Sequence, residues 1–386
     1  MENFDYFNPT RILFGNERYS ELPSQIANFT TGKRVLITYG GGSIFKNGVY
    51  DEVKKALVDY EVFDFGGIEP NPEFDTLMKA VELIKSNQID FVLAVGGGSV
   101  IDGTKFIVAA APYEGNPWDV LLRKDGCVFK EALPFGTVLT LPATGSEMNS
   151  GAVISHSPLK EKRTMGGPFL FPKFSFLAPK VVSTLPKRQI ANGITDAFMH
   201  TLEQYLTFPS GNLLQERIAE GILATLIEIA PQVMDNPSNE KAAANLMWCA
   251  TMALNGTLRA GVAYDWSTHM IGHELTALHG IDHARTLAII SPNLFRVKLE
   301  NKREKLIQYG QRVWKLQGNC AEEAIQKTEE FYNSLGIDTK LSAYTNDVKD
   351  TAATIRKRFE ERGWEGLGER QDLTPAEAEK IVELSY

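Results

Sequence analysis

The chain is poor in cysteine, and it lacks both a basic run and a long apolar run. Its three cysteines, Cys127, Cys249 and Cys320, lie far apart and form no Cys-x-x-Cys pair, so neither a disulfide framework nor a zinc knuckle is expected. A formal net charge of −8 without a basic cluster argues against a nucleic-acid partner. Because no apolar run reaches about 18 residues, no membrane span is expected.

The first residues, from Met1 to Asp5, are acidic and hold no apolar segment of the secretory kind. Together with the sparse cysteines, this start predicts a cytoplasmic protein in a reducing compartment. A length of 386 residues is too great for one small core and suggests two domains.

The first half alternates short apolar runs, rich in β-branched residues, with amphipathic stretches such as residues 74–86. In that stretch Leu77, Ala80, Val81 and Ile84 form one apolar stripe with helical spacing. Alternating strands and helices predict an α/β domain with a Rossmann-like, doubly wound parallel sheet. The expected strands are Arg11–Gly15, Val35–Tyr39, Glu61–Phe65, Phe91–Val95 and Thr137–Leu141.

Helical periodicity replaces this alternation after Leu185. The expected domains are therefore an α/β dinucleotide-binding domain over residues 1–184 and an all-α domain over residues 185–386, with the reactive site in a cleft between them. The helices expected in the second half cover residues 188–206, 215–234, 240–258, 266–278, 284–299, 303–316, 321–335 and 374–384.

Ligands of doubly wound sheets bind at the carboxyl ends of the strands, and two triple glycines fall there. They are Gly40, Gly41 and Gly42, followed by Ser43, and Gly96, Gly97 and Gly98, followed by Ser99. Glycine lets backbone N–H groups approach a phosphate, and a helix N-terminus after the second cluster favours an anion. Neither cluster matches G-x-G-x-x-G, and one alone is equally a flexible turn. Two in equivalent positions favour a nucleotide site.

A third polar segment follows the fifth expected strand. Thr144, Ser146 and Asn149 suit contacts with phosphate, ribose or a nicotinamide amide, although the same composition makes an ordinary turn. Gly151–Ser155 is expected to begin a hairpin that carries the basic residue Lys162 back over the cofactor. His156 is expected in a solvated loop.

Four of the six histidines fall between residues 269 and 283. One unbroken helix would hold the outer two about 21 Å apart, too far to share an ion. Gly280 is a natural helix terminator, so the chain can turn there and return His283 towards His269. Upstream, Asp196 and His200 repeat the one-turn spacing.

Asp196, His200, His269 and His283 therefore form the expected metal pocket. A carboxylate oxygen and imidazole nitrogens are donors that iron and zinc accept. The alternative is a set of helix-face histidines bonded to neighbouring polar groups. That alternative suits any one of them alone, whereas the whole constellation favours a metal-binding helical domain.

Several motifs together resemble the iron-containing (group III) alcohol dehydrogenases, over nearly the whole chain. They are Gly96-Gly-Gly-Ser-Val-Ile-Asp-Gly-Thr-Lys105, Leu141-Pro-Ala-Thr-Gly-Ser-Glu147, Asp196-Ala-Phe-Met-His200, and His269 with His283. Others resemble, within that family, the NADPH-dependent butanol dehydrogenases and broad-range aldehyde reductases. These are Thr10-Arg-Ile-Leu-Phe-Gly15, Tyr39-Gly-Gly-Gly-Ser43, Phe65-Gly-Gly-Ile-Glu-Pro-Asn-Pro72 and Asp265-Trp-Ser-Thr-His269.

The resemblance implies the same four metal ligands that the spacing selects. It also implies cofactor contacts from both triple-glycine loops, Asp102, Thr140, Thr144 and Lys162, and it implies a homodimer. Ligand type does not separate the Fe²⁺ that the family name favours from Zn²⁺ or Ni²⁺.

The expected function is reversible hydride transfer between NADP(H) and short-chain primary alcohols or aldehydes, mainly aldehyde reduction. The divalent ion would act as a Lewis acid on the carbonyl oxygen. NADP is expected over NAD because Gly40 stands where many dinucleotide folds carry an acidic residue. His273, one turn beyond His269, is expected to relay a proton or to line the substrate site. A purely structural helix-face role is its alternative, and that role is the expected one for His279.

Two other functions share these features. A lyase or cyclase related to dehydroquinate synthase, or an enzyme of polyol phosphates, would need basic residues for an acidic substrate. The expected pocket is flanked instead by Trp266, Met270, Ile271 and Leu275, which suits a small, weakly charged substrate. A metal-dependent binding or filament-forming protein without turnover is the third possibility.

Overall fold

The computed structural model describes residues 2–121 and 129–386, which form two compact units. The α/β unit comprises Phe7–Leu185 and Pro237–Met247. The helical unit comprises Pro186–Asn236 and Trp248–Tyr386, with the N-terminal segment up to Tyr6. Cys249 and Cys320 are free, buried thiols, whereas Cys127 lies outside the described residues.

A six-stranded, fully parallel sheet forms the centre of the α/β unit, with the strand order β1-β8-β5-β4-β2-β3. The strands are β1 (Arg11–Phe14), β2 (Arg34–Thr38), β3 (Glu61–Phe65), β4 (Phe91–Gly97), β5 (Phe135–Leu141) and β8 (Phe174–Leu177). The five strands expected from the sequence are confirmed. The sixth, β8, was not expected because it is a run of only four residues, yet it is wholly buried between β1 and β5.

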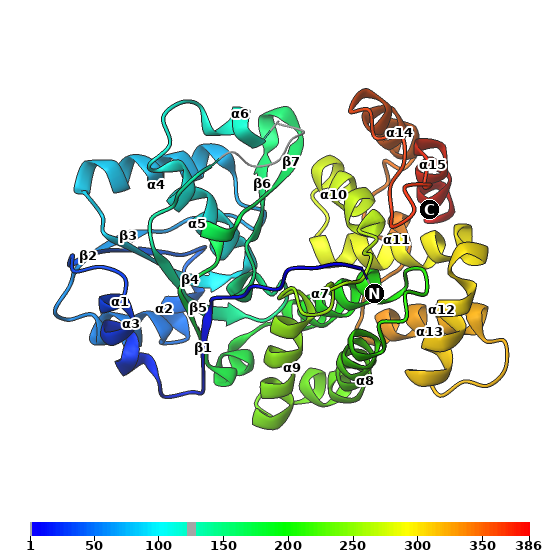
Figure 1. Cartoon of the computed structure of the whole chain (residues 1–386), viewed down its shortest axis with the longest axis horizontal. Helices are drawn as coiled ribbons and strands as arrows, with labels where there is room; N and C mark the ends of the chain where they lie inside the picture. Colours follow the sequence, from blue (N-terminus) through cyan, green and yellow to red (C-terminus); the bar gives the residue numbers. More distant parts are fainter. Residues whose placement is uncertain (1, 122–128) are drawn as a thin grey trace. The chain divides into compact units, whose positions relative to one another are not determined.

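Helices cover both faces of the sheet. Figure 1 shows α4 and α5 on one face and α1, α2 and α3 on the other, which is the doubly wound arrangement. The helices are α1 (Leu22–Ala27), α2 (Ser43–Lys46), α3 (Val49–Ala56), α4 (Phe74–Asn87), α5 (Gly98–Ala110) and α6 (Pro117–Leu121). Helix α4 buries the expected stripe, and α5 is buried along most of its length because it packs on both β4 and β6.

The core of the α/β unit lies around β4 and β5. Both strands are buried over all but their last residue, so they read as continuous apolar runs, as central strands of parallel sheets do. Phe91 on β4 stacks on Phe174 on β8, with ring centroids 5.7 Å apart. Parallel pairing brings the carboxyl ends of β2, β4 and β5 to one edge of the sheet, with a register shift between Gly96 and Gly97 where β4 ends.

An antiparallel hairpin of β6 (Gly151–His156) and β7 (Glu161–Gly166) follows the sheet and places Lys162 opposite Ser155. The expectation of a solvated His156 was wrong. Its side chain is 16% exposed. The centroid of its ring lies 5.3 Å from that of Phe74 and 4.7 Å from that of Trp118. A histidine that ends a strand over an aromatic pair is packed like a core residue.

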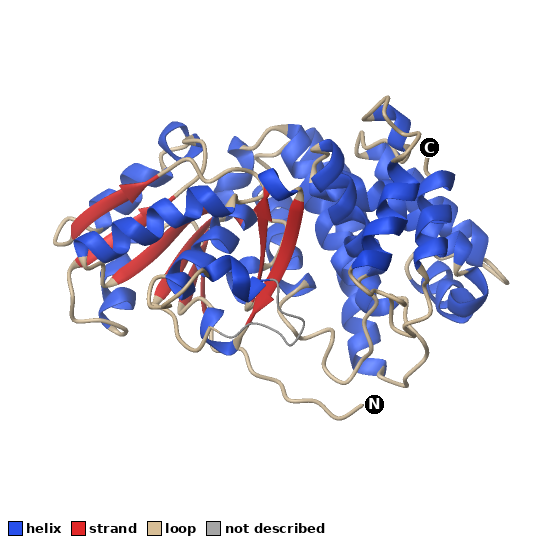
Figure 2. Ribbon diagram, turned by 90° about the horizontal axis from the view of Figure 1, so that it is seen from above, coloured by secondary structure: helices blue, strands red, loops and turns tan. Residues whose placement is uncertain are grey.

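The second unit is helical, as the sequence predicts. Its helices are α7 (Lys187–Tyr205), α8 (Leu213–Asp235), α10 (Ser267–His279), α11 (His283–Val297), α12 (Leu299–Arg312), α13 (Ala321–Ser334), α14 (Thr351–Glu361) and α15 (Pro375–Leu384), and α9 (Glu240–Ala253) contributes to both units. Helix α9 stops before the expected residue 258 because the chain turns at Gly256, where φ is 94°. Helix α14 was missed because its apolar stripe is short and charged residues surround it. In Figure 2, one unit contains both strands and helices, whereas the described residues of the other form helices without strands.

Helix α7 is the most unusual element of the helical unit, because all residues from Ile190 to Tyr205 are buried. Polar side chains on a fully buried helix need partners or a ligand. Three of these, Asp196, His200 and Glu203, follow one another at spacings of four and three residues and therefore share a face.

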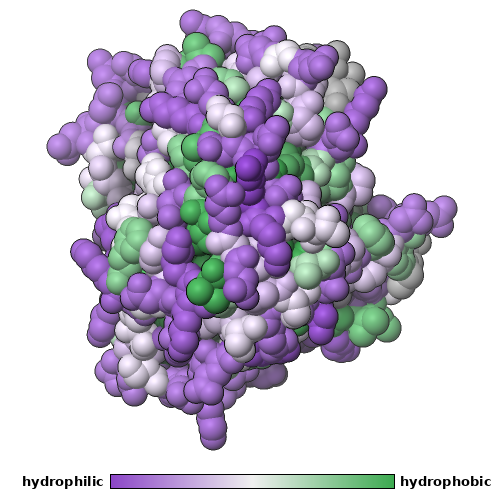
Figure 3. All heavy atoms as spheres, turned by 90° about the vertical axis from the view of Figure 1, so that its left-hand side faces the viewer, coloured by the Kyte–Doolittle hydropathy of each residue, from purple (hydrophilic) through white to green (hydrophobic). Residues whose placement is uncertain are grey.

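Hydrophilic residues cover most of the face of the molecule drawn in Figure 3, and apolar residues appear in small groups between them. Across the described residues, we find no helix with the length and apolarity that a membrane crossing requires.

Candidate functional site

Three helices of the helical unit bring together the four residues that the histidine spacing selects. Asp196 and His200 lie one turn apart on α7, His269 lies near the start of α10, and His283 is the first residue of α11. Helix α10 ends at Gly280, where φ is 67°, so the chain reverses there as expected. The reversal brings the rings of His269 and His283 to 5.1 Å, centroid to centroid.

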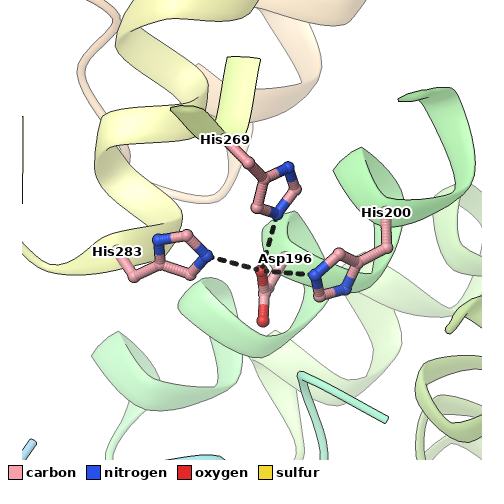
Figure 4. Close-up of side chains that lie close together, drawn as sticks. All are labelled: Asp196, His200, His269 and His283. Atoms are coloured by element: carbon pink, nitrogen blue, oxygen red, sulfur yellow. Dashed lines mark ion pairs between the residues drawn. The ribbon is translucent and has the colours of Figure 1, made fainter. Parts of the chain in front are cut away.

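The four side chains point towards one another (Figure 4). Asp196 Oδ1 lies 3.6 Å from Nε2 of His200, 4.0 Å from Nε2 of His269 and 3.6 Å from Nε2 of His283. One donor atom from each residue lies within 4.8 Å of all the others. Two ligands of a tetrahedral ion with bonds of about 2.1 Å stand about 3.4 Å apart. The donors are therefore spaced nearly as ligands of one ion would be.

Burial makes this arrangement costly unless a cation is present. Asp196, His200 and His269 are buried and His283 is half-buried. Asp196 Oδ1 is itself buried and accepts no hydrogen bond from the described residues. A buried carboxylate oxygen in that state costs free energy, which a bound cation offsets. One carboxylate oxygen and three imidazole nitrogens fit a divalent iron or zinc ion.

A second carboxylate, Glu203, lies behind His269. Its Oε2 contacts Nδ1 of His269, and its Oε1 accepts hydrogen bonds from the backbone N–H of Thr268 at 2.7 Å and of His269 at 3.4 Å. The side chain is almost completely buried. Without a cation at the neighbouring cluster, burial, followed by the charge of Asp265, raises the pKa of Glu203 to about 8; a bound cation would lower it and favour the carboxylate.

A buried ion cluster fixes the start of α10. Asp265 Oδ1 accepts a hydrogen bond from the backbone N–H of Ser267 at 2.9 Å, and Asp265 Oδ2 lies 2.8 Å from Nζ of Lys302 on α12. Lys302 also binds the carboxylate of Glu369 at 3.1 Å and the carbonyl oxygen of Leu206 at 2.8 Å. Burial alone would lower the pKa of Lys302, but the two carboxylates raise it. The helix that carries His269 is thereby tied to α12.

The two remaining histidines of this stretch have different surroundings. The ring of His273 lies 5.2 Å from that of His283 and 6.3 Å from that of His269, next to the four expected ligands. Nε2 of His279 lies 2.9 Å from Oγ1 of Thr351 at the start of α14. Only His273 therefore borders the cluster.

Trp266 forms an aromatic wall of the cluster. Its ring lies 5.2 Å from that of His269 and 6.1 Å from that of His200. Its φ of 64° is rare for a bulky residue and is characteristic of functional sites. Ile271 and Leu275, which were expected to flank the pocket, are fully buried in the core.

In the α/β unit, the first triple glycine lies just after β2, whereas Gly96 and Gly97 end the neighbouring strand β4 and Gly98 begins α5. A Cβ at Gly96 would lie 2.5 Å from the side chain of Val100, and one at Gly98 would lie 2.5 Å from that of Thr144. Close packing therefore requires glycine at both positions. The packing leaves the backbone N–H groups at the start of α5 as donors for an anion.

Lys105 occupies the centre of a hydrogen-bond network beside this loop and has no exposed surface. Its Nζ donates to Ser146 Oγ at 2.8 Å, Asn149 Oδ1 at 2.9 Å and the carbonyl oxygen of Gly151 at 2.7 Å. Burial lowers the pKa of Lys105 to about 8. A buried cation with three acceptors joins α5 to the loop and hairpin that follow β5.

Asp102 completes this network. Its Oδ1 accepts from Ser146 Oγ at 2.6 Å and its Oδ2 from the backbone N–H of Val153 at 2.9 Å, and burial raises its pKa. The structure thus brings the expected cofactor residues Asp102, Ser146 and Asn149 into one network, in which Ser146 bonds Asp102 and Asn149 is joined through Lys105. Their contact with a cofactor stays a prediction.

Lys162 is linked to the start of α5 by hydrogen bonds through Asn71, a residue that the sequence analysis did not select. Nζ of Lys162 donates to Asn71 Oδ1 at 2.9 Å, and the backbone N–H of Asn71 donates to Ser99 Oγ at 3.3 Å. Thr144 Oγ1 accepts from the backbone N–H of Ser146 at 3.2 Å, and Thr140 is buried near the end of β5. A cation is thus held close to the glycine loop.

The two units correspond to two family models. Residues 9–179 match the model described as iron-containing alcohol dehydrogenase, and residues 190–384 match the C-terminal model of the Fe-containing alcohol dehydrogenase family. The chain belongs to the iron-containing alcohol dehydrogenase family. The expected fold and enzyme class are thereby confirmed.

Similar members of this alcohol dehydrogenase family are named for different cofactors. The chain is 50% identical, over the whole of both chains, to the NADPH-dependent aldehyde reductase YqhD of Escherichia coli. It is 43% identical to the probable NADH-dependent butanol dehydrogenase 1 of Bacillus subtilis, with 91% of each chain covered. The crystal structure of Escherichia coli YqhD superposes with a TM-score of 0.96 at 48% identity, covering 100% of this chain and 99% of that chain.

Sequence reasoning missed three polar residues at the sites of this dehydrogenase: Glu203, Lys105 and Asn71. A signal existed for Glu203, because it lies seven residues after Asp196 and so on the same helical face. Lys105 carried a weaker one, since it falls among apolar residues in a helix that is buried all round. Asn71, in a Pro-Asn-Pro turn, gave none that distinguishes it from an ordinary loop residue.

Proposed function

We propose that this alcohol dehydrogenase reduces short-chain aldehydes with NADPH, and reverses the reaction on primary alcohols, at a divalent ion held by Asp196, His200, His269 and His283. The observation that carries the proposal is the buried Asp196 Oδ1, which faces three imidazole Nε2 atoms at 3.6 to 4.0 Å. The 50% identity to a protein named as an NADPH-dependent aldehyde reductase supports the substrate class and the cofactor.

A divalent ion at these donors supplies Lewis-acid polarisation of the carbonyl oxygen, worth several kcal/mol in such reactions. Asp196 contributes the negative charge that a dication needs, and the three neutral imidazoles fix its position. The ring of Trp266 covers His200 and His269 and keeps water from that side. His273, whose ring lies 5.2 Å from that of His283, would pass a proton to the oxygen of the product alcohol.

The α/β unit is proposed to bind NADP(H), which supplies the hydride. The start of α5, with Gly96, Gly98 and Ser99, suits the pyrophosphate, and Lys162 adds a positive charge near it. At the other glycine loop, Gly40 brings no carboxylate to repel a 2′-phosphate. The remaining expected cofactor residues are Gly41, Gly42, Ser43, Gly97, Asp102, Thr140, Thr144, Ser146 and Asn149.

Finer features of the proposal come from the sequence. They are Fe²⁺ as the resident ion, with Zn²⁺ and Ni²⁺ as alternatives, a homodimer, a cytoplasmic location, and a functional division into residues 1–184 and 185–386. Metal analysis after purification without oxygen and light scattering test the first two.

The test of the function is NADPH oxidation by protein loaded with Fe²⁺ or Zn²⁺, with butanal as substrate and chelator-treated protein as the control. We expect metal-dependent turnover of butanal and none of a polyol phosphate. Turnover of the polyol phosphate alone would support the dehydroquinate-synthase-like or polyol-phosphate alternative. Binding of metal without turnover of any aldehyde would support a binding protein.

A further inference from the structure

We propose that Glu203 is a positioning residue of the metal centre, whose carboxylate holds His269 in the tautomer that presents an unprotonated Nε2 to the ion. The proposal rests on the proposed metal site and adds to it a fifth protein group, which contacts the ring of His269 and not the ion.

The contact is directional. Nε2 of His269 faces Asp196 Oδ1, and Nδ1 of the same ring faces Oε2 of Glu203. The two carboxylates thus stand at opposite nitrogens of one imidazole. Glu203 and Asp196 both come from α7, so a single rigid helix sets their separation.

This arrangement of the two carboxylates keeps the proton of the His269 ring on Nδ1. A neutral imidazole carries one proton, and the nitrogen that binds a metal must be the one without it. A carboxylate next to Nδ1 accepts a hydrogen bond from Nδ1–H, so the proton stays on Nδ1. The lone pair of Nε2 is then available to the ion. Because Glu203 is 2% exposed, water competes little for the bond. Such outer carboxylates orient the ring and make it a stronger donor.

Glu203 also has a purely structural task that must be separated from this one. Its Oε1 accepts the backbone N–H groups of Thr268 and His269 in the first turn of α10, where helix donors lack partners. Capping requires only an acceptor oxygen. Positioning of the ring also uses the negative charge, so the two tasks respond differently to loss of charge at constant shape.

Glu203→Gln removes the charge and keeps both the size and an acceptor oxygen. The matched control is Glu274→Gln, at a buried carboxylate on α10, the helix that carries His269. Glu274 instead pairs with Arg358 at 2.8 Å and with Arg362, both on or next to α14. Both variants remove one buried charge that fastens α10.

The experiment is a Zn²⁺ titration of the metal-free protein in competition with a chromogenic chelator, together with thermal unfolding of the metal-free forms. Glu203→Gln is expected to weaken zinc affinity by about 10–100-fold, the usual cost of losing such a partner. Glu274→Gln is expected to keep the affinity of the unsubstituted protein, even where its melting temperature falls as far.

Unchanged zinc affinity in Glu203→Gln, with the unsubstituted protein binding zinc, would overturn the positioning role and leave the proposed function standing. Equal losses in both variants would also overturn it, since affinity would then follow the stability of α10. No zinc binding by the unsubstituted protein would remove the metal site itself. If metal-free Glu203→Gln does not fold, Glu203→Asp replaces it; weaker zinc binding supports the role, and equal binding contradicts it.

Discussion

Each unit of the molecule buries a cluster of charged groups, and the two clusters differ in spacing. Around Lys105 in the α/β unit, donors and acceptors lie 2.6 to 2.9 Å apart. In the helical unit, Asp196 Oδ1 lies 3.6 to 4.0 Å from each of three imidazole nitrogens. The first set of distances is that of hydrogen bonds, and the second exceeds it.

This difference teaches how to tell a structural cluster from a binding one when both are buried. The Lys105 network satisfies its buried cation with protein atoms, so the cation is stable there before any cofactor contacts Asp102, Ser146 or Asn149. In the Asp196 cluster, one carboxylate oxygen and three imidazole nitrogens face a common centre, and all four can donate a lone pair to a cation. Burial of these side chains is therefore favourable once an ion is bound. Each cluster should therefore respond to substitution in its own way.

Asp196→Ala should give the largest change in activity. Without its carboxylate the site loses tight metal binding, and because Lewis-acid polarisation contributes several kcal/mol, turnover should fall by about 10³-fold or more. The stability of the metal-free form should change little, since Asp196 Oδ1 accepts no hydrogen bond within residues 2–121 and 129–386. Metal content and butanal reduction are the measurements. A variant with full metal and a normal rate would place the ion elsewhere.

Lys105→Met should have the opposite signature, a loss of stability with an intact metal site. Removal of the buried cation takes the hydrogen-bond donor from three acceptors and the neighbouring positive charge from Asp102. This should lower the free energy of unfolding by on the order of 3–5 kcal/mol. Urea unfolding measures this, with Lys55→Met at an exposed position on α3 as the control. A loss no greater than that of the control would contradict the structural assignment.

His273→Gln tests whether His273 is a metal ligand or only a neighbour of the metal cluster. We expect full metal content, a rate lowered by about 10–100-fold and an altered pH dependence, because the imidazole that moves the proton is gone. Metal analysis and the pH profile of aldehyde reduction test this. Metal loss would make His273 a ligand, and an unchanged rate and profile would leave only a structural role.

Gly40→Asp should give the smallest change, confined to the choice of cofactor. A carboxylate beside the ribose should lower the efficiency with NADPH relative to NADH by about tenfold, near 1.4 kcal/mol. A Cβ here would lie 3.2 Å from the carbonyl oxygen of Ile68, so Gly40→Asn serves as the uncharged control for packing. Equal changes in both variants, or no preference for NADPH in the unsubstituted protein, would contradict the prediction.

Periodic elements of the fold could be predicted from the sequence, and short or charged ones could not. Strands β4 and β5 and helix α4 show their patterns within a few residues, because burial on one or both faces dictates those patterns. Strand β8 gave too short a signal, since its place in the sheet comes from pairing with β1 and β5, which lie far away in sequence. Helix α14 is specified mainly by its packing against α15 and α10.

The candidate metal cluster could be predicted because each of its parts is local. One-turn spacing places Asp196 with His200, and a single glycine explains the return of His283. The role of Glu203 depends on contact between two helices that are 62 or more residues apart in sequence, and hydrogen bonds such as those to Thr268 join residues 65 positions apart. Spacing alone cannot show which face of α7 meets α10, so only the three-dimensional structure shows this contact.

The most direct test of the metal site is a crystal structure of the protein loaded with Fe²⁺ without oxygen, with anomalous scattering measured at the iron edge. We predict one strong peak about 2.0–2.2 Å from Asp196 Oδ1 and from Nε2 of His200, His269 and His283. A peak at any other position, or iron-loaded protein without a peak between these four atoms, would contradict the account.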